Sequence, residues 1–209
     1  RHPRPPGRSH AWNLHREKSM TLTLITQPDI EPITLSEVKA HCRIEHRTDD
    51  TLITSLITAA RLAAEHELQR PLITQTWQAA YESFPSDHSA IALGKFRPRA
   101  IQGITYLDQN GTEADMPESA YVLDAATVPG WVHPAYNTSW PSARAFANSV
   151  RIRFTAGYGD EAADVPQCIK QWMLLMIGSM YAFREASTDR AQARLPYINS
   201  LLDPERVYL

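Results

Sequence analysis

The sequence predicts an α+β fold, in which two N-terminal helices and one long C-terminal helix form a three-helix core. An antiparallel β-rich insertion separates the first two helices from the third. Two observations carry this prediction. Apolar residues recur every three or four positions in residues 34–69 and 164–184, as they do on the buried side of a helix. In residues 73–156, short runs of alternating apolar and polar residues are typical of strands with one buried face.

Residues 150–184 read as a strand, a glycine turn and a long helix. In residues 150–156 the apolar side chains alternate with Arg151, Arg153 and Thr155. Asp164 is the expected N-cap, and a proline two positions later suits the first helical turn. The helix is apolar on most of its surface, so we expect it to be buried within the fold or between subunits. Four of its residues are predicted to pack between subunits: Trp172, Met173, Met176 and Met180.

Two shorter helices are predicted near the N-terminus. Thr34 and Glu37 have the spacing of a capping box, which starts a helix to about Ile44. Thr48-Asp-Asp precedes a second helix, which extends to about Gln69 and is ended by a proline. Its apolar stripe is predicted to contain Leu52, Ile53, Leu56, Ile57, Ala60, Ala63 and Ala64. Three charged residues are predicted off this stripe: Arg61, Glu65 and Glu67.

The β-rich insertion contains five runs that we interpret as strands: 77–81, 91–93, 101–107, 121–123 and 150–156. The Asn-Gly dipeptide at 110–111 is typical of a tight turn. Residues 127–148 form a long, proline-containing and poorly patterned segment, which we predict to be a functional loop or one that binds a partner.

Five regions follow from these patterns. They are a basic Pro/Arg-rich arm (1–19), an N-terminal helical part (20–72), the β-rich insertion (73–156), the long helix that closes the helical core (157–194) and a C-terminal docking tail (195–209). The arm precedes Met20, which resembles a natural start, so the arm could derive from an expression vector.

Charge is distributed unevenly between the arm and the rest of the chain. The first 19 residues hold five basic residues and one acidic residue out of totals of 21 and 23. Residues 20–209 therefore hold 16 basic and 22 acidic residues, a net charge of −6. An acidic body argues against a protein that grips nucleic acid by neutralising its phosphates, although it allows nucleic acid to slide past.

The composition is that of a soluble globular protein, with 43% hydrophobic and 21% charged residues. No apolar run has the roughly 20 residues needed to cross a bilayer, and no secretory signal pattern is present. The two cysteines, Cys42 and Cys168, both fall on predicted helices and indicate a reducing compartment without a disulfide framework. We expect the chain to be made inside the cell.

Metal, nucleotide and catalytic sites are not favoured by the patterns present. His41, Cys42, Glu45 and His46 could each bind zinc, but on a helix Cys42 points away from His41 and Glu45, so a polar helix end is the better interpretation. The Gly-Tyr-Gly turn at 157–159 lacks the phosphate-binding signatures and is followed by acidic residues. We therefore predict no metal site and no cofactor.

Catalysis by a nucleophile lacks a recognisable motif. His88 and His133 fall in unpatterned loops, so an enzyme whose site is assembled from dispersed residues stays an alternative. Arg151 and Arg153 could contact phosphate or an acidic partner, but a solvated sheet face is the commoner role. A DNA-binding regulator is the other alternative, although such a protein should carry a basic recognition helix.

The order of the motifs resembles the head-tail connector (adaptor) proteins of tailed phages, in the form with a β insertion that also occurs in prophages and gene transfer agents. The resemblance runs from about Ile33 to Val207. It is carried by Val-Lys-Ala-His, Thr-Asp-Asp-Thr-Leu-Ile, Gln-Thr-Trp and Ile-Thr-Tyr-Leu-Asp-Gln-Asn-Gly, then by Tyr-Val-Leu-Asp, Val-Arg-Ile-Arg-Phe-Thr-Ala-Gly-Tyr-Gly, Val-Pro-Gln-Cys-Ile-Lys-Gln and Leu-Leu-Asp-Pro-Glu-Arg-Val.

This resemblance implies a structural, non-enzymatic subunit of a ring, usually dodecameric. The ring sits beneath the portal, extends the DNA channel and joins capsid to tail. The implied partners are further copies, the portal protein, a downstream tail or stopper protein, and double-stranded DNA that passes without sequence-specific binding. The implied location is the neck of a virion or phage-like particle assembled in the host cytoplasm, with no membrane partner.

The C-terminal tail is the expected docking element, because it is apolar and aromatic. We predict that the tail docks on the portal or on an adjacent subunit through seven residues: Tyr197, Ile198, Leu201, Leu202, Arg206, Val207 and Tyr208. We also expect the β insertion and its proline-containing loop to face the tail side or the next subunit.

Overall fold

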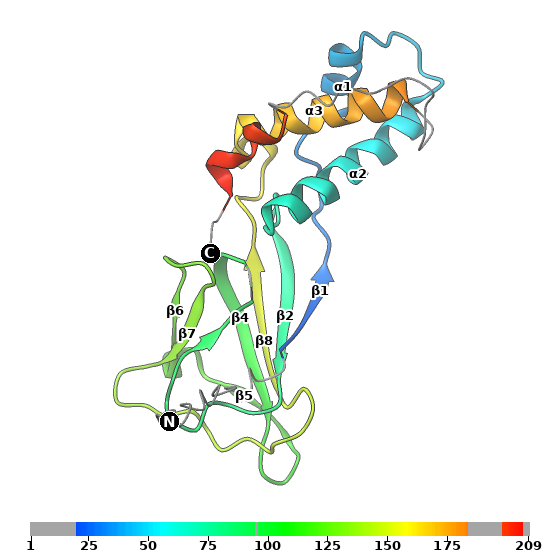
Figure 1. Ribbon diagram of the computed structural model, residues 1–209. Helices are drawn as coiled ribbons and strands as arrows, with labels where there is room; N and C mark the ends of the chain where they lie inside the picture. Colours follow the sequence, from blue (N-terminus) through cyan, green and yellow to red (C-terminus); the bar gives the residue numbers. More distant parts are fainter. Residues whose placement is uncertain (1–19, 95, 184–197, 207–209) are drawn as a thin grey trace, which may run out of the picture.

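The computed structural model describes residues 20–94, 96–183 and 198–206. It confirms the α+β class. A layer of helices lies at one end of an elongated molecule and the strands form the other end (Figure 1). None of the helices in the described part of the chain has the length and apolarity that a bilayer crossing requires.

The helical layer consists of α1 (Leu35–Cys42), α2 (Asp50–Leu68) and α3 (Gln167–Ala182). All three contribute to one apolar cluster, in which Val38, Ile57 and Ile177 are buried. The predicted capping box at the start of α1 is confirmed, since the amide of Glu37 donates to Oγ1 of Thr34 at 3.2 Å and the amide of Thr34 donates to Oε2 of Glu37 at 2.6 Å.

Helix α3 begins two residues later than we predicted, with its N-cap at Pro166 and not at Asp164. Asp164 is not its N-cap, because Asp164 ends a separate 3₁₀ turn, η2 (Ala162–Asp164), where its carboxylate accepts the amide of Glu161 at 3.0 Å. Val165 is extended, as expected for a residue that precedes proline, and Pro166 is the cap residue of α3. The helix ends at Ala182, and residues 184–194 of the predicted C-terminal helical region lie outside the described residues.

Five antiparallel strands form the larger sheet in the order β1-β2-β8-β4-β5. They are β1 (Thr21–Thr26), β2 (Gln75–Tyr81), β8 (Val150–Ala156), β4 (Pro98–Leu107) and β5 (Glu113–Met116). Strand β1 was not predicted, and it lies at the start of the region 20–72 that we named the N-terminal helical part. Its alternating Thr-Leu-Thr-Leu pattern suits an edge strand with one face packed, and it pairs with β2 from Thr21↔Ala80 onward.

A smaller sheet of three antiparallel strands covers one face of the larger one (Figure 1). Its order is β3 (Ile91–Ala92), β7 (Trp131–Pro134), β6 (Tyr121–Asp124), and the 3₁₀ turn η1 (Glu118–Ala120) leads into β6. Strand β7 lies inside the segment 127–148 that we predicted to be a loop. Val132 of β7 is fully buried with Ile152 and Phe154 of β8, and together they form part of a second apolar cluster.

Three chain segments connect the two layers: 27–34 leads from β1 to α1, 69–74 from α2 to β2, and 157–166 from β8 to α3. The last two lie side by side. The amide of Thr74 donates to the carbonyl of Gly159 at 2.9 Å, and the amide of Tyr158 donates to the carbonyl of Leu72 at 3.1 Å. Two short 3₁₀ turns, η3 (Asn199–Leu201) and η4 (Asp203–Glu205), return to the helical layer.

Candidate functional site

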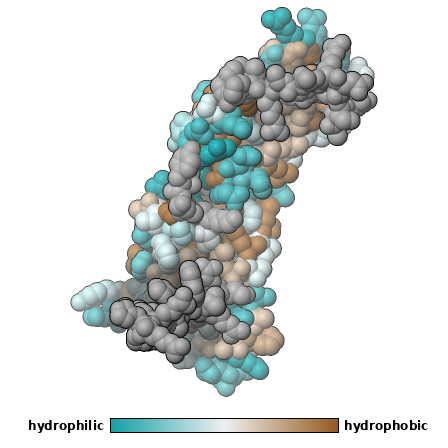
Figure 2. Space-filling view, viewed as in Figure 1, coloured by the Kyte–Doolittle hydropathy of each residue, from teal (hydrophilic) through white to brown (hydrophobic). Residues whose placement is uncertain are grey.

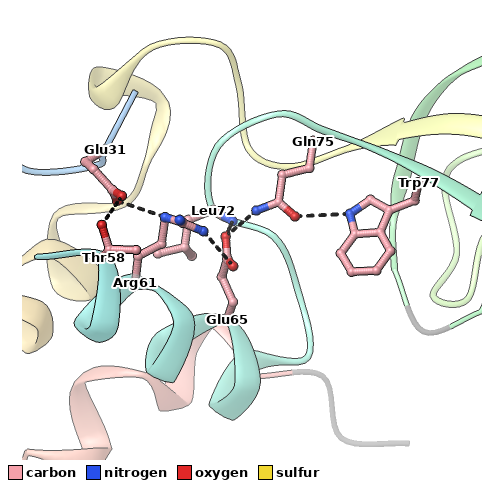
Figure 3. A network of polar contacts seen from close by, with 7 residues as sticks. All are labelled: Glu31, Thr58, Arg61, Glu65, Leu72, Gln75 and Trp77. Carbon is pink, nitrogen blue, oxygen red and sulfur yellow. Dashed lines mark hydrogen bonds and ion pairs between the residues drawn. The ribbon is translucent and has the colours of Figure 1, made fainter. Parts of the chain in front are cut away.

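A polar network connects the helical layer to the larger sheet (Figure 3). Its central member is Arg61 of α2, which is 3% exposed although we predicted it to lie off the apolar stripe. Nε of Arg61 donates to Oε2 of Glu31 at 2.8 Å, and Nη1 donates to Oε2 of Glu65 at 3.2 Å. Thr58 donates to the other oxygen of Glu31. Two carboxylates therefore balance a guanidinium that would be costly to bury alone.

Glu65 extends this network to the sheet. Its Oε1 accepts the amide of Leu72 at 3.0 Å and the side-chain amide of Gln75 at 2.8 Å. Oε1 of Gln75 in turn accepts a hydrogen bond from the indole N–H of Trp77 at 3.1 Å. Burial raises the pKa of Glu65, and the Leu72 amide and Arg61 counter only part of that effect. Groups from both layers thus hold one half-buried carboxylate at the junction.

A second polar cluster binds the C-terminal 3₁₀ turns to the junction. The hydroxyl of Tyr158 donates to Oε2 of Glu205 at 2.7 Å. Nη1 of Arg70 donates to the same hydroxyl at 3.0 Å, and its guanidinium carbon lies 4.1 Å from the centroid of the Tyr158 ring. Nη2 of Arg206 lies 3.0 Å from Oε2 of Glu67. Residues 198–206 are therefore held by their own chain.

The predicted docking residues of the tail have different environments. Leu202 is fully buried in the apolar cluster of the helices, so its own chain encloses it, and docking through this residue stays a prediction. Ile198 and Leu201 pack against the same cluster but stay partly exposed. Arg206 forms the ion pair described above. Docking through Ile198, Leu201 and Arg206 stays a proposal. The remaining residues of the set lie outside the described residues: Tyr197, Val207 and Tyr208.

The four residues of α3 that we predicted to pack between subunits also differ in their burial. Trp172 and Met173 are 3% and 0% exposed, because they pack within the apolar cluster of their own helices, and a contact of these two with a neighbouring subunit stays a prediction. Met176 and Met180 are only partly buried. Packing between subunits therefore stays a proposal for Met176 and Met180.

The zinc-like group at the end of α1 does not assemble into a site. Across the described residues, no three His, Cys, Asp or Glu side chains are placed to share a metal ion. Instead, His41 and Cys42 lie against α3, since a Cβ added at Gly178 would be 3.8 Å from Sγ of Cys42 and from Nε2 of His41. Burial raises the pKa of the Cys42 thiol. This helix end contacts its neighbouring helix.

The turn after β8 is filled by the chain itself. Gly157 has a φ of +141°, and a Cβ there would lie 2.7 Å from the carbonyl carbon of Ile73. A Cβ at Gly159 would overlap the carboxylate of Asp164. A carboxylate thus lies where a phosphate would have to approach, which agrees with a structural role for this turn.

The arginines on β8 make contacts within the sheet. Nη2 of Arg151 lies 2.8 Å from Oε2 of Glu113 on β5, and Nε of Arg153 donates to Oε1 of Gln78 on β2 at 3.2 Å. The two dispersed histidines, His88 and His133, are both exposed.

A family model described as "Phage gp6-like head-tail connector protein" matches residues 32–118, fewer than half of the chain. No curated protein matches the sequence. Among solved structures, a chain from the neck of an empty GTA particle, computed with C6 symmetry, is similar with a TM-score of 0.73 and 20% identity; the match covers 90% of this chain and 96% of the other.

Two further solved structures have a similar fold. A chain from the virion of a native gene transfer agent (GTA) particle has a TM-score of 0.72, and one from the neck of a native GTA particle, computed with C12 symmetry, has 0.71; both are 20% identical, with coverage of 90% and 96%. The resemblance to head-tail connector proteins that the sequence predicts is thus confirmed, by the family model over residues 32–118 and by the fold over most of the chain.

Proposed function

We propose that this chain is a structural subunit of the neck of a tailed phage or gene-transfer particle, where it forms a ring beneath the portal, extends the DNA channel and joins capsid to tail. One observation carries the proposal. The fold agrees with that of a neck chain over nearly the full length of both, 90% and 96%, with a TM-score of 0.73. The family-model match, which spans α1, α2 and strands β2 to β5, supports the same role.

The proposed partners are other copies of this chain, a portal protein on one side and a tail or stopper protein on the other. Twelve copies are the expected number, because one similar chain comes from a neck computed with C12 symmetry. A ring of identical subunits requires a head-to-tail contact that closes after a full rotation.

Double-stranded DNA is proposed to pass through this ring without sequence-specific binding. The net charge of −6 on residues 20–209 disfavours a tight grip on phosphates. Helix α2, the longest in the described residues, carries a single Lys or Arg, and that residue is the buried Arg61. A regulator that reads base edges needs basic side chains on an exposed helix face. The polar clusters at the junction join parts of the fold, and we assign no catalytic role to them.

The test is a particle preparation from producing cells that lack this chain. We expect DNA-filled heads and separate tails by electron microscopy, and restoration of joined particles when the wild-type chain is supplied. A cryo-electron microscopy map of the restored neck should place a ring of this fold between portal and tail. Complete, infectious or transducing particles formed without the chain would contradict the proposal.

A further inference from the structure

The large apolar residues that the described chain leaves exposed fall mainly on two sides of the molecule. Ile25 on β1, Ile30 after β1 and Leu62 on α2 are 46%, 41% and 51% exposed. We call the surface that contains them the β1–α2 flank. Val122 on β6 and Tyr136 after β7 are 56% and 92% exposed. We call the surface around them the β6 flank.

The β1–α2 flank is continuous from the sheet to the helical layer. Glu31 binds Thr58 and Arg61 of α2, so the preceding Ile30 lies beside this helix. Leu62 follows Thr58 by four residues and therefore shares its side of α2. Brown, apolar side chains follow the side of the molecule on which β1 and α2 lie (Figure 2; elements labelled in Figure 1).

The exposed face of α2 on this flank is uncharged over several turns. Between Thr51 and Ala64 the only charged residue is the buried Arg61. The hydroxyls of Thr54 and Ser55 donate to carbonyls of their own helix at 2.9 and 2.7 Å, so they do not depend on water for a partner. A face of this kind is suited to close packing against another protein surface, whereas solvated helix faces are usually charged.

The β6 flank lies on the opposite side of the strands. Strand β6 is an outer strand of the order β3-β7-β6, and Figure 1 shows β6 and β1 on opposite sides. Strand β3, at the other edge of this sheet, ends beside β1, since a Cβ at Gly94 would lie 3.2 Å from Cε of Met20. On β6, Val122 pairs with the exposed His133, so both stand on the outer face of the sheet.

Each flank includes a strand with one edge that is not paired with any of the described strands. Strand β1 is the outer strand beside β2, and β6 is the outer strand beside β7. Unpaired strand edges with exposed apolar residues favour association with another chain. Two different surfaces of this kind, on opposite sides of one molecule, are what a head-to-tail contact between copies requires.

The charged residues on the two flanks also favour a contact between the β1–α2 flank and the β6 flank. Asp29, beside Ile30 on the β1–α2 flank, is exposed and forms no ion pair with the described residues. Arg97 is exposed near the end of β6, where its Nε donates to the carbonyl of Ala125 at 3.0 Å, and it too forms no ion pair within the described part of the chain. One flank thus offers a carboxylate and the other a guanidinium.

We propose that the β1–α2 flank of one copy packs against the β6 flank of the next copy, with Asp29 facing Arg97 across the contact. This inference rests on the proposed ring and identifies the surfaces that would build it. Repetition of the contact around an axis uses every flank once and leaves neither exposed.

The first test uses two flank variants, Ile25→Asp and Val122→Asp, with Phe183→Asp as the control, because Phe183 is 46% exposed like Ile25 but lies at the end of α3. Assembly is followed by sedimentation velocity and native mass spectrometry over a concentration series. Each flank variant should raise the concentration needed for assembly by about 100-fold or more, because a carboxylate would be desolvated in an apolar contact. The control should assemble like the wild type.

Mixing the two flank variants tests the head-to-tail geometry. The Ile25→Asp chain keeps an intact β6 flank and the Val122→Asp chain keeps an intact β1–α2 flank, so an equal mixture should form heterodimers and nothing larger. Asp29→Arg and Arg97→Asp should each weaken assembly by about tenfold, and the chain that carries both should recover it.

Four results would overturn the inference: wild-type assembly by both flank variants, a mixture that stays monomeric, equal loss in the Phe183→Asp control, or a wild-type chain that is monomeric at every concentration. Thermal unfolding of each variant separates lost assembly from lost folding. None of these outcomes bears on the connector role, which depends on particles that lack the chain.

Discussion

Arg61 and Glu65 lie on successive turns of α2, with Nη1 of the arginine 3.2 Å from Oε2 of the glutamate, and this pair joins the helical layer to the sheet. The other oxygen of Glu65 accepts hydrogen bonds from Leu72 and Gln75, which lead into β2. The pair therefore fixes how the two layers meet as well as how α2 packs.

Replacement of the arginine should destabilise the whole fold. Arg61→Ala would leave Glu31 and Glu65 without their cation at a largely buried site, and we expect the free energy of unfolding to fall by about 3 kcal/mol in urea denaturation. The control is Arg151→Ala, which breaks the more exposed pair with Glu113 and should cost less than about 1 kcal/mol. Equal losses for the two variants would refute a structural role for the network.

The pH dependence of stability should carry a contribution from Glu65. Because burial raises its pKa above the ordinary 4.5, the folded protein holds the proton more readily than the unfolded chain. The stability that this group contributes is fully present below pH 4.5 and is lost as pH rises through the folded pKa. The difference in unfolding free energy between wild type and Glu65→Gln should therefore decrease as pH rises, and then level off.

Glu37 provides a control of opposite sign for that measurement. Hydrogen bonds from the side chain and backbone of Thr34 lower its pKa, so its contribution is present at neutral pH and is lost as pH falls through the folded pKa. The difference between wild type and Glu37→Gln should increase with pH. Slopes of the same sign for both glutamates would contradict these assignments.

The turn after β8 should tolerate no side chain at Gly157. Gly157→Ala forces a Cβ to within 2.7 Å of the Ile73 backbone at a φ of +141°, so we expect a loss of at least about 2 kcal/mol in the free energy of unfolding. Gly103→Ala on β4 is the control, since a Cβ there meets nothing within 4 Å, and its effect should stay within about 1 kcal/mol. Similar values for both glycines would show that the close approach is unimportant.

Truncation of Leu202 should release the C-terminal turns from the helical layer. The side chain is fully buried, so Leu202→Ala is expected to cost about 2–4 kcal/mol. Hydrogen exchange at residues 198–206 should accelerate, while exchange in β2 and β8 should change far less. Leu201→Ala, at a partly exposed neighbour, should have a smaller effect. Unchanged exchange in Leu202→Ala would mean that the polar cluster around Tyr158 holds the segment alone.

Local patterns were sufficient where neighbouring residues alone determine the structure. The capping box of Thr34 and Glu37 and the alternation in β8 were both predicted from spacing. Arg61 shows where such reasoning fails. It follows Ile57 by four residues, so the helical period itself places it on the buried side, and only its charge argued for exposure. Of its two carboxylate partners, Glu65 lies one turn further along α2, whereas Glu31 is 30 residues away in the sequence and only the fold brings it to Arg61.

Strands β5 and β7 were missed because their stability comes from their neighbours. Strand β5 reads Glu-Ala-Asp-Met, which has low strand propensity, yet it pairs with the longer β4. Strand β7 ends in Pro134 and is short, but it lies between β3 and β6. The exposed flanks were likewise invisible in the sequence, since Ile25 and Leu62 resemble core residues until the packing of their neighbours is known.

The order of the elements along the chain has a consequence for synthesis on the ribosome. The eight strands of the described residues lie within residues 21–156, whereas α3, which covers the apolar side of α2, begins only at residue 167. The strands can therefore be translated completely before α3 is available to bury Ile53, Ile57 and Ala64 of α2. A nascent chain stalled before α3 would expose the apolar side of α2 to chaperones. Only a chain that includes α3 could bury this side before the subunit assembles.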